Sequence, residues 1–253
     1  MKLFFRKVGE KGKPIVILHG LFGSSKNWIS NAKILSETRT VYSLDLRNHG
    51  DSPHSDSHTL EDLVNDLKEF IEENLDEKPD LIGHSMGGMT TTLLALHYPE
   101  LFDKFVCVDI APRTYPLRFE EQFKALSMDV SEMKSREEID KKMSEILPDP
   151  FLRNFLQMNL ERNETGYRWK INTDVLHKSR KSLEFPGNLP PYTGICLFVL
   201  GEISEYIHKE DSEVIKSKFP GAELKWISGA GHYLHYTHSK EFLKIVSDFL
   251  NLS

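Results

Sequence analysis

The chain has 253 residues, of which 39% are hydrophobic and 28% charged, close to average globular usage, which excludes a disordered or fibrous protein. Acidic residues outnumber basic ones, 38 to 32, and the net charge of −6 leaves no positive field for nucleic acid or anionic lipid. No apolar stretch reaches the ~20 residues of a membrane span. Because charges interrupt the first apolar residues, we expect no secretory leader and a cytoplasmic location, unless a transit peptide has been removed.

Short apolar runs alternate with helical patterns along the chain. We expect strands at 14–20, 40–46, 79–85, 104–110, 195–201 and 222–228. Apolar positions at helical spacing predict a helix over 60–71, begun by a capping pair of Thr59 and Asp62. Further helices are expected from residue 86 to Pro99 and over 239–250. The order indicates an α/β protein with a mostly parallel central sheet flanked by helices.

Residues 112–190 break this alternation. The stretch has many charges, scattered aromatic residues and no convincing strand, and prolines stand at both ends. We expect a helical cap insertion over the active site, because long excursions from a sheet are often functional lids. The core domain would then comprise 1–111 and 191–253. The alternative is a set of ordinary crossover helices packed in the core.

The two cysteines, Cys107 and Cys196, lie in apolar runs. Two cysteines do not make the dense disulfide framework of a small secreted domain. Free cysteine is often buried as a small hydrophobe, so we expect two reduced thiols rather than a disulfide.

The segment "GHSMG" at 83–87 matches G-x-S-x-G, in which a sharp strand-to-helix turn exposes a nucleophilic serine. The pattern can arise by chance, but here it follows an expected strand and opens an expected helix, as the motif requires. Ser85 is the candidate nucleophile, and the Met86 amide is placed to bind an oxyanion. The second donor is expected after the first strand, at Leu21 or alternatively Phe22. Without the serine motif, "HGLFG" would be interpreted as a plain glycine-rich turn.

A serine hydroxyl needs a neighbouring base to become a nucleophile. His232 follows a Gly-Ala-Gly sequence directly after the last expected strand, where a flexible loop can carry an imidazole to the serine. His235 and His238 are the alternatives. His19 and His84 flank the two turns and are expected to make supporting hydrogen bonds.

The base in turn needs an acid to orient it. Asp109 ends the run at 104–110 and would project from the carboxyl end of that strand. After the strand at 195–201 the sequence offers Glu202 and Glu205 but no aspartate, and Asp174 is a further alternative. Neither "HTLED" nor "HYLHYTH" holds a complete set of metal ligands, so no metal site is expected.

Five segments, "LHGLFGS", "DLRNHGDSPHS", "GHSMGG", "VDIAP" and "AGHYLH", resemble the α/β-hydrolase superfamily. Within it they are most similar to the short-acyl esterase branch that contains abhydrolase-domain-containing protein 11 and its bacterial relatives. The resemblance is dense over 14–116 and 194–250 and thin across the insertion. It implies the α/β-hydrolase fold, no cofactor, and a site of Ser85, His232, Asp109, Leu21 and Met86. In many members the acid follows the strand that 195–201 matches. This chain has "GEISEYI" at that place and so departs from the pattern, which favours Asp109.

Together these features predict a carboxylesterase-type serine hydrolase that cleaves esters of short to medium acyl chains through an acyl-enzyme. An acyl-CoA thioesterase, a carbon–carbon bond hydrolase or a perhydrolase could use the same scaffold. A non-catalytic ligand-sensing or chaperone-like protein is the alternative from another class, whereas haloalkane dehalogenation needs a carboxylate at the serine position. We expect a small-molecule ester or thioester substrate and a monomer or weak homodimer. The aromatic residues expected to line the pocket are Phe22, Phe119, Phe123, Trp169 and Tyr233.

Overall fold

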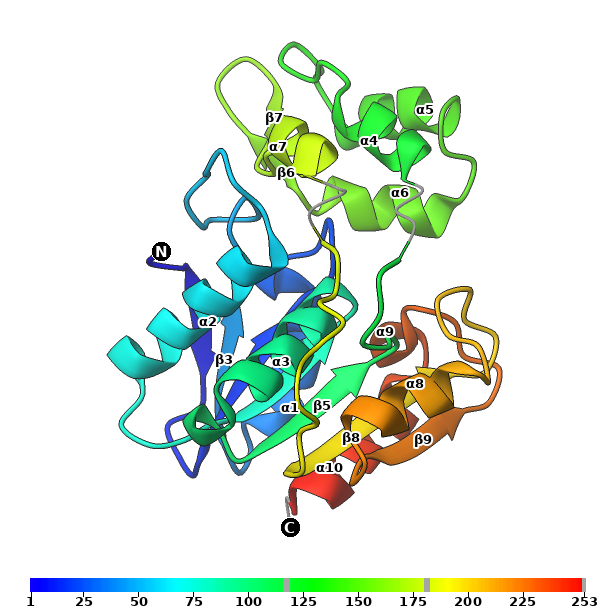
Figure 1. Ribbon diagram of the computed structural model, residues 1–253. Coiled ribbons are helices and arrows are strands. Elements are labelled where there is room, and N and C mark those ends of the chain that lie inside the picture. The colour runs from blue at the N-terminus through cyan, green and yellow to red at the C-terminus, as the bar shows by residue number, and fades with distance from the viewer. Residues whose placement is uncertain (116–118, 180–182, 252–253) are drawn as a thin grey trace.

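A seven-stranded sheet forms the centre of the computed structural model, which describes residues 1–115, 119–179 and 183–251 (Figure 1). The strands are β1 (Phe5–Val8), β2 (Pro14–Leu18), β3 (Thr40–Leu44), β4 (Asp80–His84), β5 (Lys104–Val108), β8 (Ile195–Gly201) and β9 (Glu223–Ile227). They lie in the order β1-β3-β2-β4-β5-β8-β9. Only β1 is antiparallel to its neighbour, so the expected mostly parallel sheet is confirmed.

Each of the six expected strands contains one strand of this sheet. The first strand, β1, was not expected from the sequence. It is short and carries Arg6 and Lys7, and these charges interrupt the apolar pattern that marks the buried strands. Charged residues are common on strands at the edge of a sheet, where β1 lies, because they discourage pairing with another chain.

Alternate residues of the strands supply two separate apolar clusters, one on each face. Val16 and Leu18 of β2 pack with α2 (Leu60–Asn74), α3 (Met86–His97) and α8 (Asp211–Lys218). Ile15 and Ile17 pack on the opposite face with α1 (Ile29–Leu35) and α10 (Ser239–Leu250). This period of two is what a strand covered on both sides requires.

The helix α2 begins where its capping residues predict. Thr59 Oγ1 accepts a hydrogen bond from the Asp62 amide at 3.1 Å, and Asp62 Oδ2 accepts one from the Thr59 amide at 2.9 Å. The reciprocal pair satisfies two N–H groups that have no partner within the helix. Short helical segments complete the core: η1 (Ser25–Trp28), η2 (Pro99–Leu101) and α9 (Leu234–Thr237).

A further group of elements lies above the carboxyl edge of the sheet, at the top of Figure 1. It comprises α4 (Glu120–Leu126), α5 (Arg136–Ser144), α6 (Pro150–Gln157), β6 (Leu160–Arg162), β7 (Tyr167–Trp169) and α7 (Thr173–Lys178). These elements, which we call the cap, have an apolar cluster of their own that includes Ile139, Met143, Leu156 and Leu160. Ordinary crossover helices would instead pack in the clusters of the sheet.

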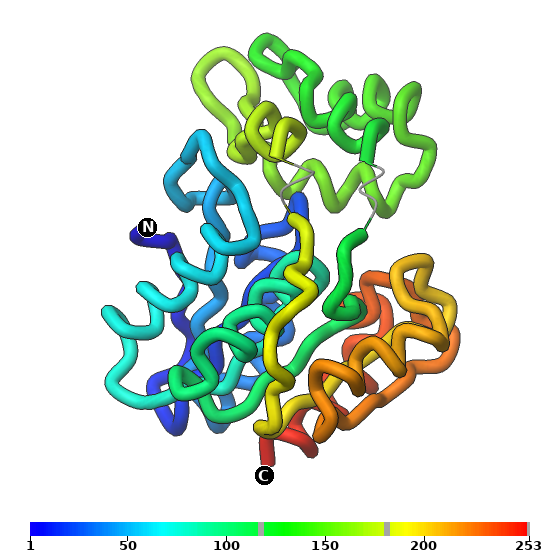
Figure 2. The backbone as a smooth tube through the Cα atoms, viewed as in Figure 1, coloured from blue at the N-terminus to red at the C-terminus, as the bar shows by residue number. Residues whose placement is uncertain are grey.

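The cap differs from the sequence expectation in two ways. The expectation that residues 112–190 hold no strand is wrong, because β6 and β7 pair as an antiparallel hairpin. Each strand has only three residues, too few to show a pattern, and the turn is held by Asn163 Oδ1, which accepts from the Gly166 amide at 2.8 Å. Leu183 and Phe185 lie within the expected insertion but pack in the core cluster. Figure 2 shows the chain descending along the core after these residues.

Both cysteines are buried and free, as expected. Burial raises the pKa of the Cys107 thiol, and it raises that of Cys196 to about 12, which makes both thiols unreactive at neutral pH. Over residues 1–115, 119–179 and 183–251, the helices are too short or too polar to cross a bilayer.

Candidate active site

Ser85 stands on a strained turn between β4 and α3. Its backbone has φ 52° and ψ −117°, a conformation that non-glycine residues rarely adopt. Its amide donates to the Val108 carbonyl at 3.0 Å, which ties the turn to the next strand. A Cβ at Gly83 would lie 2.3 Å from the Gly87 carbonyl oxygen, so a side chain there would push the turn apart. The local geometry is that of a nucleophile elbow, with Ser85 facing a cavity.

Asp109 and His232 are joined by a hydrogen bond of 2.7 Å between Oδ2 and Nδ1. Asp109 lies just beyond β5, is fully buried, and also has a positive φ of 52°. A carboxylate only accepts hydrogen bonds, so Nδ1 of His232 is the donor, which leaves Nε2 as the ring nitrogen that can act as a base. The structure therefore brings together one strand-end acid and the histidine of the late loop.

The loop after β8 supports this acid. The Gly201 amide donates to Asp109 Oδ1 at 2.7 Å, and the Ser204 hydroxyl donates to Oδ2 at 2.5 Å. Ser204 Oγ also accepts from the Tyr206 amide at 3.2 Å, and the Tyr206 ring stacks on His232. With three donors, the Asp109 carboxylate is satisfied without water. Sequence reasoning missed Ser204 and Tyr206, because nothing in a short polar loop shows which way its side chains point.

The alternative acids lie elsewhere. Glu202 is exposed, and its carboxylate accepts hydrogen bonds from Ser228 and Gly229, of which the first contributes most to lowering its pKa. Glu205 lines the cavity but makes no hydrogen bond to His232. Asp174 is in the first turn of α7, within the cap.

The alternative histidines also have other partners. His235 is buried with its ring stacked on Trp28 at 4.5 Å between centroids, and burial lowers its pKa to about 3. His238 contacts the Thr237 hydroxyl through Nδ1. His84 bonds through Nε2 to the carbonyl of His232 at 2.9 Å, which is the supporting contact expected of it.

Three further histidines, two of which the sequence analysis did not single out, are buried in or next to the loop at 19–23 that holds the expected oxyanion donor. The rings of His19 and His49 lie 5.0 Å apart, and those of His49 and His58 lie 5.6 Å apart. Nε2 of His49 accepts from the Phe22 amide at 3.3 Å, and His58 contacts the Met86 sulfur at 3.4 Å. Burial lowers the pKa of all three, that of His58 to about 3, so the rings are neutral at pH 7.

The Phe22 amide already donates to His49, whereas Leu21 and Met86, the other two expected oxyanion donors, differ in this respect. Within the described part of the chain, neither the Leu21 nor the Met86 amide donates a hydrogen bond to a protein group. Leu21 lines the same cavity as Ser85, and the Met86 amide begins α3, where the helix dipole favours negative charge.

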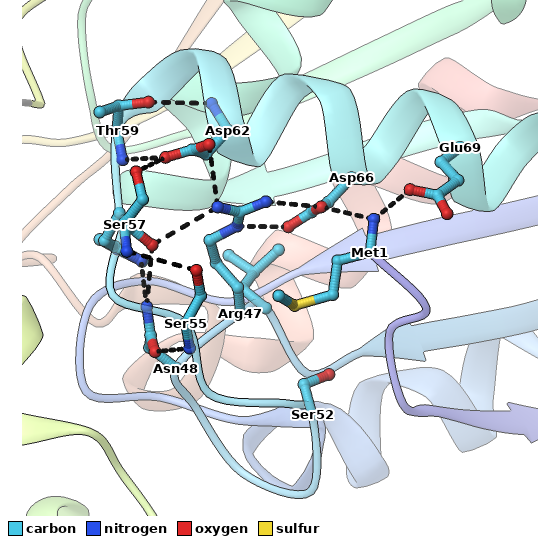
Figure 3. Close-up of polar contacts among 12 residues, drawn as sticks. Met1, Arg47, Asn48, Ser52, Ser55, Ser57, Thr59, Asp62, Asp66 and Glu69 are labelled. Atoms are coloured by element: carbon cyan, nitrogen blue, oxygen red, sulfur yellow. Dashed lines mark hydrogen bonds and ion pairs between the residues drawn. The ribbon is translucent and has the colours of Figure 1, made fainter.

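The loop that carries His49 is fastened to α2 by Arg47 (Figure 3). The Arg47 guanidinium binds both carboxylate oxygens of Asp66, at 2.6 and 2.8 Å, and reaches Asp62 at 2.9 Å. The Met1 amino group also pairs with Asp66, at 2.9 Å. Asn48 Nδ2 donates to the Ser57 carbonyl at 3.2 Å and closes the loop. A bidentate, nearly buried pair holds its geometry better than an exposed one.

A cavity of about 320 Å³ opens above Ser85, between the sheet edge and the cap. Of the five aromatic residues expected in the pocket, Phe22, Phe119 and Tyr233 line it. Phe123 packs in the cap cluster instead, and the Trp169 indole donates to the Met128 carbonyl at 2.9 Å. Other lining residues were not foreseen: Leu152, Phe151, Phe155, Leu156, Ile203 and Tyr206. Most come from α6, whose eight residues are too few to show which face is turned to the sheet.

The described residues contain no group of three or more His, Cys, Asp or Glu side chains that could hold a metal ion. The chemistry available in the cavity is that of a serine hydroxyl, an imidazole held by a buried carboxylate, and two amides. Such a set can attack a carbonyl carbon and stabilise the resulting oxyanion.

Known proteins are similar to this chain over nearly its whole length. A family model described as "alpha/beta hydrolase fold" matches residues 13–239. The sn-1-specific diacylglycerol lipase ABHD11 of Mus musculus is 35% identical and covers 93% of this chain and 80% of its own length. Esterase YbfF of Escherichia coli K12 is 30% identical, with 96% of this chain and 94% of its own covered. A solved structure of a marine microorganism esterase is 42% identical, with a TM-score of 0.93 over 98% of this chain and 99% of its own.

Proposed function

The chain belongs to the α/β-hydrolase fold family, and on this basis we propose that it is a carboxylesterase with Ser85 as nucleophile, His232 as base and Asp109 as acid. The observation that carries the proposal is the Asp109–His232 hydrogen bond, whose histidine lines the same cavity as the strained Ser85. The names of the relatives, two esterases and a lipase, support ester hydrolysis.

The reaction begins when Nε2 of His232 takes the proton of the Ser85 hydroxyl as the oxygen attacks the ester carbonyl. The Leu21 and Met86 amides receive the developing oxyanion, and each such donor contributes about 3 to 4 kcal/mol to transition-state stabilisation. The imidazolium then protonates the leaving alcohol, and an acyl-enzyme remains. Water, deprotonated by the same histidine, releases the acid and restores the hydroxyl of Ser85.

Asp109 has two tasks in this cycle. It holds the His232 tautomer in which Nε2 is the base, and its negative charge stabilises the imidazolium. The donors from Gly201 and Ser204 hold the fully buried Asp109 carboxyl group in the orientation in which it accepts from His232.

The size of the cavity supports substrates with short to medium acyl chains. Ligand pockets for small molecules usually measure about 300 to 1,000 Å³, and this cavity of about 320 Å³ lies at the lower end. Apolar and aromatic residues from α6 and the oxyanion loop offer surface for an acyl chain. A cytoplasmic location and a monomeric or weakly dimeric state remain predictions.

The proposal is tested with p-nitrophenyl esters of increasing acyl length and with a fluorophosphonate probe. We expect hydrolysis and labelling of the native chain, and a loss of at least about 10³-fold in kcat/KM in Ser85→Ala. Ser217→Ala, an exposed serine on α8, is the matched control and should keep full activity. Equal activity in Ser85→Ala and the native chain would exclude Ser85 as nucleophile. A folded chain that neither hydrolyses any ester nor reacts with the probe would instead be a binding protein.

A further inference from the structure

A second cavity of about 450 Å³ adjoins the one above Ser85. It lies where the cap meets the core, between η1 and α1 on one side, α6 on another, and α9 with the start of α10 on the third. The two cavities share three lining residues, Phe151, Phe155 and Tyr233. These three side chains therefore form the partition between the cavities.

The partition consists of aromatic rings from both parts of the molecule. Phe151 and Phe155 come from α6 of the cap, and each ring lies 5.1 Å from that of Tyr233, measured between centroids. Tyr233 directly follows His232 in the chain. All three residues are partly exposed and line both cavities, so the partition is made of these side chains alone. A substrate arm that passes from the first cavity into the second displaces one or more of these rings.

The second cavity has both aromatic and polar lining residues. The partition is aromatic, whereas five other lining residues, from η1, α1 and α6, are polar: Lys26, Asn27, Ser30, Asn31 and Asn154. Lys26 is half-buried, and no carboxylate in the described part of the chain forms an ion pair with its ammonium group. His235 is 95% buried in the same wall, and its Nδ1 has no hydrogen-bond partner among the described residues.

A half-buried, unpaired ammonium in a cavity with amide donors suits an acidic group. Lysine binds carboxylate and phosphate oxygens as a compact charge, and the Asn side chains can add neutral donors. An aromatic entrance followed by a cationic end matches an arm that is apolar near the reacting ester and acidic at its tip.

We propose that the second cavity is a subsite for one arm of the ester substrate, and that this arm ends in an acidic group bound by Lys26. The inference rests on the proposed esterase function and specifies its substrate class. It predicts that the physiological ester carries a carboxylate or phosphate several bonds from the scissile carbonyl, on either the acyl or the alcohol side.

The test compares acidic esters with neutral esters of the same length. One series is the monomethyl esters of dicarboxylic acids against methyl esters of fatty acids. The other is the acetyl esters of ω-hydroxy acids against acetyl esters of primary alcohols. We expect a preference in one of the two series, namely the one whose acidic group is on the arm that enters the second cavity. Once that arm is long enough to cross the partition, the acidic ester should have a kcat/KM about tenfold higher than the neutral ester of the same length. A charge-assisted hydrogen bond gives an effect of this size, chiefly through a lower KM.

Lys26→Gln should reduce this preference to about twofold or less and leave hydrolysis of the short neutral esters unchanged. Lys33→Gln changes an exposed lysine on α1 that lines neither cavity, so it should keep the preference and controls for net charge. Ser30→Trp, which fills the second cavity, should reduce turnover of the long acidic ester only.

Two results would overturn the inference. One is the absence of a preference for acidic esters in both series, and the other is a preference that persists in Lys26→Gln. In either case hydrolysis of neutral esters by the native chain would leave the proposed function intact. Failure of the native chain to hydrolyse any ester, together with an unlabelled Ser85, would instead refute the proposed function itself.

Discussion

The imidazole of His232 lies face to face with the phenol ring of Tyr206, with 3.9 Å between centroids and 26° between the ring planes. Tyr206 is itself fixed, because its amide donates to the Ser204 hydroxyl that holds Asp109. A cation above an aromatic face is stabilised by about 0.5 to 2 kcal/mol. In the proposed cycle His232 becomes a cation when Ser85 attacks, so the Tyr206 ring favours the charged state.

Replacing Tyr206 by leucine should therefore lower kcat by about fivefold to tenfold, whereas phenylalanine, which keeps the aromatic face, should retain most of the activity. Steady-state kinetics over pH 5 to 9 check this. Because the imidazolium loses stabilisation, the acidic limb of the rate profile should move to lower pH in Tyr206→Leu. An unchanged profile with an increased KM alone would show that Tyr206 contacts the substrate and does not act on His232.

Asp109→Asn should reduce kcat by about 10³- to 10⁴-fold with little change in KM. The asparagine can offer its amide nitrogen to His232, which favours the wrong tautomer and removes the negative charge. Glu202→Gln is the control, because its carboxylate bonds only to Ser228 and Gly229. If Glu202→Gln were the inactive variant and Asp109→Asn the active one, the acid would belong to the loop after β8.

Arg47→Met should lower the free energy of unfolding by about 3 kcal/mol, because it leaves the buried Asp66 carboxylate without its bidentate partner. The Met1 amino group still contacts Asp66, so we expect the lower end of the range for such pairs. Urea denaturation measures the effect. Lys68→Met removes the exposed Lys68–Glu72 pair on the same helix and should leave the free energy of unfolding almost unchanged. Equal losses of unfolding free energy in the two variants would contradict the prediction that the buried Arg47–Asp66 pair stabilises the fold more than the exposed pair does.

Stability should fall as the pH drops below about 6.5, the pKa of histidine in an unfolded chain. Burial lowers the folded-state pKa of His19, His49, His58, His84 and His235, to about 3 for His58 and His235. The unfolded chain then binds protons that the folded chain does not, and the stabilisation present above pH 6.5 is lost between that pH and about 3.

At pH 5.5 this difference in proton binding lowers the free energy of unfolding by about 1 kcal/mol for each histidine. Urea midpoints measured from pH 8 to 5 provide the check, and His58→Gln should flatten the slope by one histidine. A midpoint that stays constant from pH 7 to pH 5 would show that these rings are protonated without cost in the folded chain.

The positions of six strands along the chain, the capped helix α2 and the turn around Ser85 could be predicted, because each depends on residues adjacent in sequence. Continuous apolar runs mark strands covered on both faces, and the Thr59–Asp62 pair is local. The β6–β7 hairpin could not be predicted, since three-residue strands show no period.

The candidate active site depends more than the fold does on contacts between residues that are distant in sequence. The sequence could indicate which segments carry a serine, an acid and a histidine, because the ends of parallel strands meet at one edge of the sheet. It could not show that Ser204 turns inward to Asp109, or that Phe151 and Phe155 face Tyr233 while Phe123 and Trp169 do not. Side-chain direction in a cap is set by the surface it meets, and that surface is distant in sequence.

The contact of α6 with Tyr233 has a consequence for engineering. Caps are attractive units to exchange between enzymes when a new specificity is sought. Here, however, Phe151 and Phe155 pack on the residue that follows the proposed catalytic histidine in the chain, so a transplanted cap would also replace side chains that pack next to His232. A chimera that keeps these two aromatic positions would change the pocket while preserving the alignment of His232.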